Sequence, residues 1–384
     1  MNDLVFRISP NIVLGPYTIS RLGQQIKDWG TRFIVIADPL LGETKISEKI
    51  VQSLQERKLE GFAFAEIAEG STTRAIERAL KLAREGHVHG VIAVGGAKAM
   101  HVGRAVAAFF NEAESQDVYS FVDGNAPVKP AIPCICIPTT FRCPHCFSSS
   151  IPVTDSRSNQ LKMIKVQDNL CRLVLIDPNL MLSLTENQRA TLSLEMLGMA
   201  TEAYLSQKAN FFSDMLVEKG LEILSYAMDG SPSLEISTPE EVLLAQAGCM
   251  ISLAAATSSL GIGSLLAMGI YSRYHKSKSL VSSILLPYIL EDTAKYKAAK
   301  LERIARLMRT CPQEITGEDA VRSLIEYVRQ KIAKYNLPTR LKDLQLKVEN
   351  LSLVIEDIMP VDIINTLPRS MSADDLFGFV KLAF

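Results

Sequence analysis

Short apolar runs alternate with amphipathic segments through the first half of the chain. The runs at Arg32–Asp38 and Gly90–Gly96 predict buried strands, and the second ends in a glycine pair. Ser71 and Thr72 are suited to cap a helix that continues to Glu85, with apolar side chains along one face. Further helices are predicted at 19–29, 47–57 and 99–110, further strands at 61–67, 131–137, 150–154 and 172–176, and a polar loop at 112–130. This alternation predicts a parallel sheet covered by helices.

The pattern changes in the second half of the chain. Helical periodicity dominates from Thr185 to the C-terminus, so we predict an α/β domain over residues 1–180 and an all-helical domain over residues 181–384. The stretch Val242–Ser272 contains no charged residue and is long enough to span a bilayer. Its polar residues, among them Gln246 and Ser252, favour a buried pair of helices over a transmembrane helix.

Composition narrows the class of protein. Of 384 residues, 47% are apolar and 22% are charged, which is typical of a soluble globular protein and excludes disordered, collagen-like and coiled-coil proteins. The net charge of −1, without a basic run, argues against a protein devoted to nucleic acid or to an anionic membrane. The N-terminus lacks the basic and apolar regions of a signal peptide, so we expect a cytoplasmic protein with mostly reduced thiols.

The strand that ends in the glycine pair is a candidate phosphate site. Gly95-Gly96-Ala97-Lys98 links a strand to a helix, and glycines there let the backbone approach an anion at the helix N-terminus. Asp38, at the end of an earlier strand, is placed to accept hydrogen bonds from a ribose. Thr139 and Thr140 follow another strand and are suited to hydrogen-bond a nucleotide. Each feature also has a structural explanation: a tight turn needs glycine, and an aspartate often caps a helix.

Taken together, these residues resemble the iron-containing alcohol dehydrogenase family, which is related to dehydroquinate synthase and glycerol dehydrogenase. The resemblance covers nearly the whole chain. Its motifs are Ala93-Val94-Gly95-Gly96-Ala97, Ile137-Pro138-Thr139-Thr140, Ile176-Asp177-Pro178, Glu202-Ala203-Tyr204-Leu205-Ser206, Leu260-Gly261 and Ile284-Leu285-Leu286-Pro287.

The resemblance implies a fold and a reaction. It implies a Rossmann-like nucleotide domain, an all-helical domain and an active site in the cleft between them, with reversible hydride transfer between NAD(P)H and an alcohol or carbonyl compound. Asp38 stands where the family has the acid that binds the adenosine ribose, which favours NAD over NADP. Lys162 stands where the family places a lysine near the cofactor. The family also implies a homodimer that acts on a small molecule.

The sequence departs from the family at the metal ligands, which are usually one aspartate and three histidines. The corresponding positions here are Glu195, Met199, Ser264 and Lys278, and a further family histidine is replaced by Met268. None of the five histidines falls at a ligand position. Thioether, hydroxyl and ammonium groups do not replace imidazoles on a divalent ion, so we predict that no metal binds here.

Two of these substitutions carry opposite charges. We predict that Lys278 lies where the metal charge would lie and pairs with Glu195, since buried charges need partners. The alternative is that the two side chains diverge towards solvent. If a substrate carbonyl binds there, Lys278 is suited to polarise it or to donate a proton.

The loop after Thr140 also differs from the family. The family's Gly-Thr-Gly-Ser-Glu becomes Arg142-Cys143-Pro144-His145-Cys146, and Phe141 replaces a small residue. Lys98, Arg142 and His101 make this region more basic than is usual in the family. Cys134 and Cys136 lie nearby on one face of a strand. The cysteines are open to three interpretations: plain thiols, a reversible disulfide or a metal site.

Three functions remain open from the sequence. The first is an NAD-linked oxidoreductase that works on an alcohol or aldehyde without the usual metal. The second is a catalytically degenerate relative that serves as a ligand-binding or assembly module. The third is a non-redox enzyme that uses the basic cleft.

Overall fold

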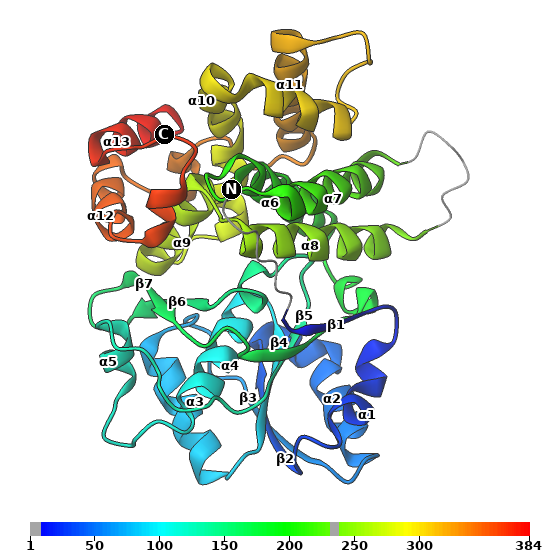
Figure 1. Ribbon diagram of the computed structural model, residues 1–384, viewed down its shortest axis with the longest axis vertical. Helices are drawn as coiled ribbons and strands as arrows, with labels where there is room; N and C mark the ends of the chain where they lie inside the picture. Colours follow the sequence, from blue (N-terminus) through cyan, green and yellow to red (C-terminus); the bar gives the residue numbers. More distant parts are fainter. Residues whose placement is uncertain (1–8, 231–237) are drawn as a thin grey trace. The chain divides into compact units, whose positions relative to one another are not determined.

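The computed structural model describes residues 9–230 and 238–384. The chain divides into two compact units, Met1–Ser183 and Leu184–Phe384. We describe each unit in turn (Figure 1).

The N-terminal unit is built on a sheet of six strands. The strands are β1 (Asn11–Leu14), β2 (Arg32–Ala37), β3 (Glu60–Phe64), β4 (Gly90–Gly95), β5 (Cys134–Pro138) and β8 (Cys171–Ile176). Their order across the sheet is β1-β8-β5-β4-β2-β3, and every neighbouring pair is parallel. Two further strands, β6 (Ser150–Asp155) and β7 (Gln160–Lys165), form an antiparallel pair beside the sheet.

Helices cover both faces of the sheet (Figure 1). They are α1 (Leu22–Ile26), α2 (Ile46–Gln55), α3 (Thr73–Glu85), α4 (Ala97–Phe109) and α5 (Val118–Val122). One face of the sheet packs in a continuous apolar core with α1 and α2, through residues such as Phe33, Val35 and Ile50. The other face receives α4, where a Cβ at Gly103 would lie 2.6 Å from the Cβ of Ala93. The close approach explains why this helix carries glycine at that point.

Short turns of 3-10 helix follow several strands. They are η1 (Thr18–Arg21), η2 (Pro39–Thr44), η3 (Pro144–Cys146) and η4 (Pro178–Met181). The Thr72 hydroxyl accepts a hydrogen bond from the N–H of Ala75 at 3.1 Å, which is the helix cap that the sequence predicts for α3. The predicted helix at 19–29 is shorter than expected, because η1 occupies its beginning and α1 ends at Ile26.

The C-terminal unit is helical throughout its described residues. Its helices are α6 (Glu186–Leu205), α7 (Phe211–Asp229), α8 (Glu240–Thr257), α9 (Ile262–Tyr274), α10 (Lys278–Leu307), α11 (Gly317–Lys334), α12 (Val348–Ile358) and α13 (Ala373–Leu382), with 3-10 turns η5 (Leu341–Leu344) and η6 (Asp362–Thr366). Helix α10 packs against α6, α9 and α11, while α7 packs along α8. The predicted fold class, a Rossmann-like parallel-sheet domain followed by an all-helical domain, is confirmed.

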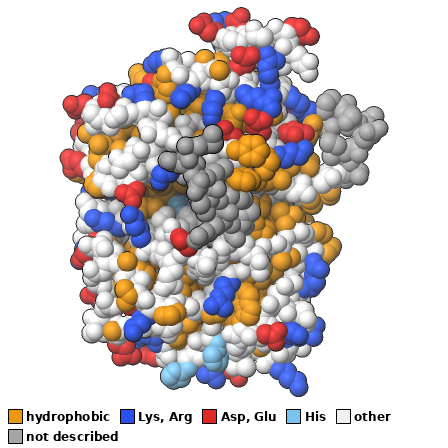
Figure 2. Space-filling model, in the orientation of Figure 1, with side chains coloured by type: hydrophobic (Ala, Val, Ile, Leu, Met, Phe, Trp, Pro, Cys, Tyr) orange, Lys and Arg blue, Asp and Glu red, His pale blue; other side chains and the backbone are white. Residues whose placement is uncertain are grey.

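The uncharged stretch Val242–Ser272 forms most of α8 and α9, largely buried within this unit. The two helices meet at a bend of 94°. Among the described residues, no single helix is long and apolar enough to cross a membrane, and only the two bent helices together have the length and composition of such a span. On the face that Figure 2 shows, basic and acidic side chains are interspersed over the surface, in keeping with the near-zero net charge.

Candidate functional site

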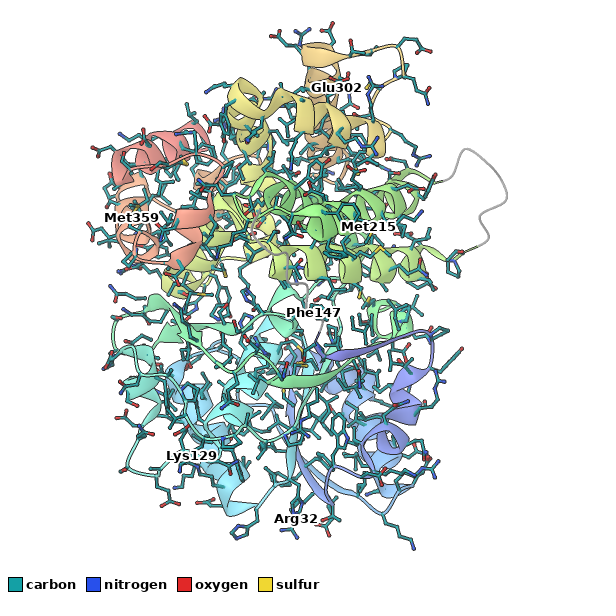
Figure 3. All side chains as sticks on the ribbon, in the orientation of Figure 1. Arg32, Lys129, Phe147, Met215, Glu302 and Met359 are labelled. Atoms are coloured by element: carbon teal, nitrogen blue, oxygen red, sulfur yellow. The ribbon has the colours of Figure 1, made fainter. Side chains whose placement is uncertain are left out.

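The glycine pair lies at the carboxyl end of three adjacent strands. The backbone N–H of Asp38 donates to the carbonyl of Val94 at 3.0 Å, and the N–H of Thr139 donates to the carbonyl of Gly95 at 2.9 Å. The loops after β2, β4 and β5 are therefore tied together at one edge of the sheet. Figure 3 shows the two ends of the sheet: Arg32 marks the amino end of β2, and Phe147, in the loop that follows β5, lies at the opposite end of this unit. In open parallel sheets, ligands bind at the carboxyl edge.

The two glycines of the pair have different reasons to be glycine. Gly95 has a φ of +140°, and a Cβ there would lie 2.5 Å from the Cβ of Asp38. Only glycine tolerates that position. Gly96 has a φ of −79°, and the nearest atom to a Cβ there would be Oδ2 of Asp38 at 3.7 Å, an ordinary contact. The turn itself therefore requires Gly95 but not Gly96.

The Asp38 side chain is buried and already makes two contacts. Its Oδ1 accepts a hydrogen bond from the N–H of Leu40 at 3.1 Å and lies 3.1 Å from the ammonium of Lys98. Asp38 thus caps η2, which is the structural role that the sequence left open for it. Its Oδ2 faces Gly96 and has capacity to accept hydrogen bonds from a ligand. Because Lys98 pairs with Asp38, its positive charge is already partly neutralised before a phosphate binds.

The first turn of α4 follows directly after the pair. Gly96 is the N-cap residue and Ala97 begins the helix, so the N–H groups of this turn have no acceptor within the helix. Such groups, with the positive end of the helix dipole, favour an anion. Thr139 is buried beside them, and the Thr140 hydroxyl accepts a hydrogen bond from Arg142 at 3.2 Å. The predicted residues Asp38, Gly95, Gly96, Ala97, Lys98, Thr139 and Thr140 are all placed at this edge.

Lys162 is placed differently from the other predicted cofactor residues. It lies on β7, paired with Val153 of β6, and its charge lowers the pKa of the Asp123 carboxyl alongside the larger effect of Arg157. Among the described residues, no hydrogen bond or ion pair connects it with the glycine turn.

His101 lies on the helix that follows the turn, with its ring buried. The ring packs edge-on against the ring of His145, with the centroids 5.1 Å apart. The Ser71 hydroxyl lies 3.5 Å from Nδ1 of His101. Lys98 and Arg142 are basic side chains with contacts at this edge, to Asp38 and Thr140 respectively.

In the C-terminal unit, the family's metal positions carry residues with other contacts. Glu195 and Met199 are buried on α6, and Met268 is buried on α9. The Ser264 hydroxyl donates to Oε2 of Glu202 at 2.5 Å, and the Ser264 N–H donates to Oε1 at 3.0 Å. Ser264 therefore holds a buried carboxylate of α6.

The carboxylate that accepts both hydrogen bonds from Ser264 belongs to Glu202, a buried residue of α6. Burial raises the pKa of its carboxyl, and hydrogen bonds from Ser264, Gly261 and Gly263 act in the opposite direction. A Cβ at Gly261 would lie 2.7 Å from Cγ of Glu202, so the loop before α9 is packed directly on this side chain.

Lys278 is the first residue of α10. Its Nζ lies 5.1 Å from the centroid of the Tyr271 ring, a cation–π contact that joins α10 to α9. Ammonium has no lone pair, and the Ser264 hydroxyl is committed to Glu202. The side chains at the family's ligand positions therefore do not fit ferrous iron or zinc. The pairing of Lys278 with Glu195 stays a prediction.

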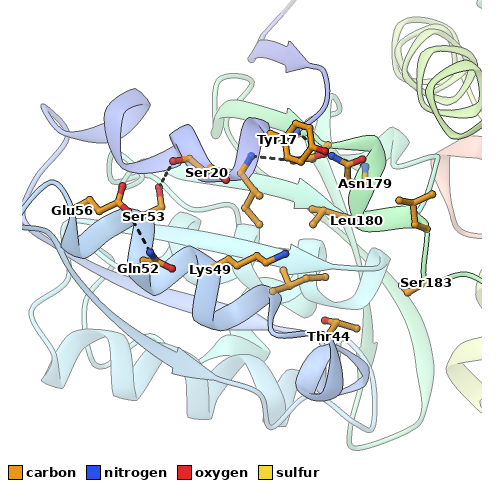
Figure 4. A pocket seen from close by; sticks show the side chains of 14 residues that line it. Tyr17, Ser20, Thr44, Lys49, Gln52, Ser53, Glu56, Asn179, Leu180 and Ser183 are labelled. Carbon is orange, nitrogen blue, oxygen red and sulfur yellow. Dashed lines mark hydrogen bonds between the residues drawn. The ribbon is translucent and has the colours of Figure 1, made fainter. Parts of the chain in front are cut away.

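A cavity of about 660 Å³ lies elsewhere in the N-terminal unit, bordered by η1, α2 and η4 (Figure 4). Several polar groups on its wall have structural partners. Asp177 accepts hydrogen bonds from the N–H groups of Tyr17, Ile19 and Asn179 at 3.1 to 3.2 Å. The Ser53 hydroxyl accepts from Gly23 and donates to Ser20. These contacts hold η1 and α2 together, so the glycine turn is the stronger candidate site.

The chain matches two family descriptions in succession. Residues 9–178 match "Iron-containing alcohol dehydrogenase" and residues 189–384 match "Fe-containing alcohol dehydrogenase family, C-terminal". It is 21% identical to lactaldehyde reductase of Escherichia coli strain K12 over 372 residues, 96% of this chain and 97% of that protein. It is 19% identical to the NAD-dependent methanol dehydrogenase of Bacillus methanolicus over 98% of this chain and 99% of that protein.

Solved structures of dehydrogenases and reductases also resemble this chain in fold. A 1,3-propanediol oxidoreductase superposes with a TM-score of 0.89 at 19% identity, over 99% of this chain and 100% of that one. A sulfoacetaldehyde reductase from Bifidobacterium kashiwanohense, solved in complex with NAD+, superposes with a TM-score of 0.82 at 14% identity, over 99% of each chain. From the two matches and the shared fold, we conclude that this chain belongs to the iron-containing alcohol dehydrogenase family.

Proposed function

We propose that this protein is an NAD-linked oxidoreductase that interconverts a small alcohol and its aldehyde without a bound metal. The observation that carries the proposal is Gly96. The fold does not require glycine there, since φ is −79° and a Cβ would have room. A missing side chain beside an aspartate oxygen and a helix N-terminus is useful where a ligand approaches the backbone.

The residues around Gly96 fit a dinucleotide. The first turn of α4 is suited to a phosphate, and Oδ2 of Asp38 is suited to accept the hydroxyls of a ribose. An added 2′-phosphate would face the Asp38 carboxylate, which favours NAD over NADP. When bound, the reduced nicotinamide supplies a hydride to a carbonyl carbon. The names of the relatives, an NAD-dependent methanol dehydrogenase among them, support this choice of cofactor.

We assign the second half of the reaction to Lys278. Hydride addition to an aldehyde leaves charge on its oxygen, which must receive a proton. The Lys278 ammonium is suited to polarise that oxygen and to donate the proton, and we propose that Glu195 balances its charge. A lysine supplies a proton where the family's metal would supply Lewis acidity. A small substrate is in keeping with the named activities of the relatives, such as lactaldehyde reductase.

A titration tests the cofactor and a turnover assay tests the reaction. NADH and NADPH are titrated separately into the full chain, and oxidation of NADH is followed with a panel of short aldehydes. The proposal expects saturable NADH binding, weaker NADPH binding and turnover of at least one aldehyde. Absence of NADH binding contradicts it, whereas binding without turnover favours a ligand-binding module.

Substitutions then test Lys278. Lys278→Met is expected to lower kcat by about 100-fold, as for loss of a general acid. Lys278→Arg tests whether charge alone suffices, and Lys276→Met, two residues earlier in the loop, is the matched control. Elemental analysis of the active protein is expected to give far less than one iron or zinc per chain. Stoichiometric metal that is needed for turnover overturns the metal-independent reaction.

A further inference from the structure

Five buried cysteines form one connected group in the N-terminal unit. We refer to it as the thiol cluster; its members are Cys134, Cys136, Cys143, Cys146 and Cys171, and none of these is more than 6% exposed. Cys134 and Cys171 are partners on the adjacent strands β5 and β8. Phe147, labelled in Figure 3, follows Cys146 and marks the place of the cluster.

Two members of the thiol cluster are already close enough to react with each other. The Cys146 thiol donates to Sγ of Cys143, and the two sulfurs are 3.0 Å apart. Both lie at η3, with Cys143 before the turn and Cys146 at its end. A sulfur–sulfur bond needs a further approach of about 1 Å. A small adjustment of one side-chain torsion supplies such an approach.

A buried guanidinium lies beside these sulfurs. Arg104, on α4, is 1% exposed, and it donates hydrogen bonds to the carbonyl groups of Ser150, at 3.0 Å, and Ser148. Its Nε has no acceptor, and no carboxylate lies within ion-pair distance of it in the described parts of the chain. A buried cation without a counter-charge is costly, so an ionised group nearby is favoured. The charge of Arg104 acts to lower the pKa of the thiols of Cys136, Cys143 and Cys171.

The two sulfurs of the pair differ in chemistry. The pKa of the Cys143 thiol is lowered, first by the hydrogen bond from Cys146 and then by the charges of Arg142 and Arg104. The pKa of the Cys146 thiol is raised, chiefly by burial. Cys143 is also the more exposed, at 6% against 2%. Thiolate and access together make a cysteine reactive, so Cys143 is the attacking sulfur and Cys146 the sulfur that closes the bond.

We propose that Cys143 and Cys146 form a reversible disulfide when the protein meets a small hydroperoxide. The Cys143 thiolate attacks one peroxide oxygen, the O–O bond breaks, and the departing oxygen takes a proton to leave as water or an alcohol. The sulfenic acid on Cys143 is then attacked by Cys146, the S–O bond breaks, and the Cys146 proton leaves with the hydroxide as water. The cysteines lose two electrons and the peroxide gains them.

The burial of Cys143 and Cys146 limits the size of the oxidant that can reach their sulfurs. At 6% and 2% exposure, the sulfurs are accessible to hydrogen peroxide or a short alkyl hydroperoxide but not to a protein disulfide. Oxidation also removes the Cys143 thiolate, which the charges of Arg142 and Arg104 favour. Since a stabilised thiolate favours the reduced form, the disulfide is expected to be reduced readily by a small dithiol.

The test uses the unmodified full chain and hydrogen peroxide. The reduced protein is exposed to a few equivalents of peroxide at pH 7, alkylated and mapped by mass spectrometry. The proposal expects the peptide that contains Cys143 and Cys146 to become 2 Da lighter and unalkylated, and a dithiol to reverse the change. Cys311 is the internal control because it is the more exposed cysteine, and Cys143 is expected to oxidise at least tenfold faster.

Variants separate the roles of the two sulfurs. Cys146→Ser is expected to stop at a sulfenic acid on Cys143 that dimedone captures, whereas Cys143→Ser is expected to form neither product. Cys311→Ser is the matched control and behaves as the parent protein. Arg104→Met is expected to slow oxidation of Cys143 by at least tenfold, and Arg104→Lys retains part of the rate.

Three results overturn the proposal. They are faster oxidation of Cys311 than of Cys143, an unchanged thiol content after peroxide treatment, and a stoichiometric soft metal ion held by the cluster. The comparison of Cys143 with Cys311 is made within one unaltered protein, so it stands even if a variant does not fold. NADH turnover plays no part in these readouts.

Discussion

Substitution of the two neighbouring glycines separates the requirement of the fold from that of the ligand. Gly95→Ala places a Cβ 2.5 Å from the Cβ of Asp38 and keeps a φ of +140°. A left-handed backbone costs a residue with a side chain about 1–3 kcal/mol, and an overpacked contact costs about 1–3 kcal/mol more. We expect Gly95→Ala to lower the free energy of unfolding of the N-terminal unit by about 3 kcal/mol.

Gly96→Ala is the matched control. Its Cβ meets Oδ2 of Asp38 at an ordinary 3.7 Å. Alanine is a poorer N-cap than glycine, but it also reduces the entropy of the unfolded chain, and the two effects are of similar size. We therefore expect the free energy of unfolding to change by less than about 1 kcal/mol. NADH affinity is expected to fall at least tenfold, about 1.4 kcal/mol, because the new methyl group lies in front of the ribose-binding oxygen.

The chain provides a suitable probe for this comparison. Trp29 is the single tryptophan, and it packs against the apolar core of the N-terminal unit. Its fluorescence during urea unfolding reports on that unit, where a loss of about 3 kcal/mol lowers the midpoint by about 1.5 M at a typical slope. Equal losses of stability in the two variants would refute the steric reasoning. Unchanged NADH binding by a stable Gly96→Ala variant would refute the role of Gly96.

Three further predictions concern individual contacts. Asp38→Asn removes the charge that disfavours a 2′-phosphate, so the ratio of NADPH to NADH affinity is expected to rise at least tenfold in a titration; an unchanged ratio would remove Asp38 from the cofactor site. Ser264→Ala takes a donor from Glu202 and is expected to cost about 2 kcal/mol near neutral pH. Burial raises the pKa of the Glu202 carboxyl in the folded state, so the neutral carboxyl adds stability that is fully present below about pH 4.5 and is lost as pH rises through the folded pKa. The Ser264 hydrogen bond favours the ionised carboxylate, so its removal should lower stability more at pH 7.5 than at pH 4.5. Urea unfolding at the two pH values checks the sign. Asp357→Asn leaves Arg273 without its buried charged partner, 2.8 Å away, and is expected to lower the free energy of unfolding by about 3 kcal/mol. Asp319→Asn, in an exposed pair with Arg322, is the control and should cost less than about 0.5 kcal/mol. Similar urea-unfolding midpoints for the two variants would contradict this prediction.

The sequence predicted those elements whose boundaries carry a local signal. Strands β2 and β4 are continuous apolar runs, and α3 has a threonine cap and one apolar face. The strand β1 and the helix α5 were not predicted, because they have only four and five residues. Strand β7 was missed because polar and apolar residues share it, as in Gln160–Lys165.

For the candidate site, the sequence indicated the residue types at the strand ends but not their pairing. The ion pair of Asp38 with Lys98 joins residues 60 positions apart, and nothing local predicts it. Arg104 was missed altogether. The sequence did contain a signal for Arg104, because it is one arginine within a mostly apolar stretch of α4 that is buried from Ala99 to Phe109.

The contact between Ser264 and Glu202 has a consequence for introducing the family's histidine at position 264. A histidine restored at position 264 would remove the hydroxyl that donates to the buried Glu202 carboxylate at 2.5 Å. It would also need space at the start of α9, where Gly261 and Gly263 already lie against the Glu202 side chain. A histidine introduced at position 264 alone is thus expected to lower stability. Placing the family's histidine at position 264 therefore requires compensating changes around Glu202 as well as the single substitution.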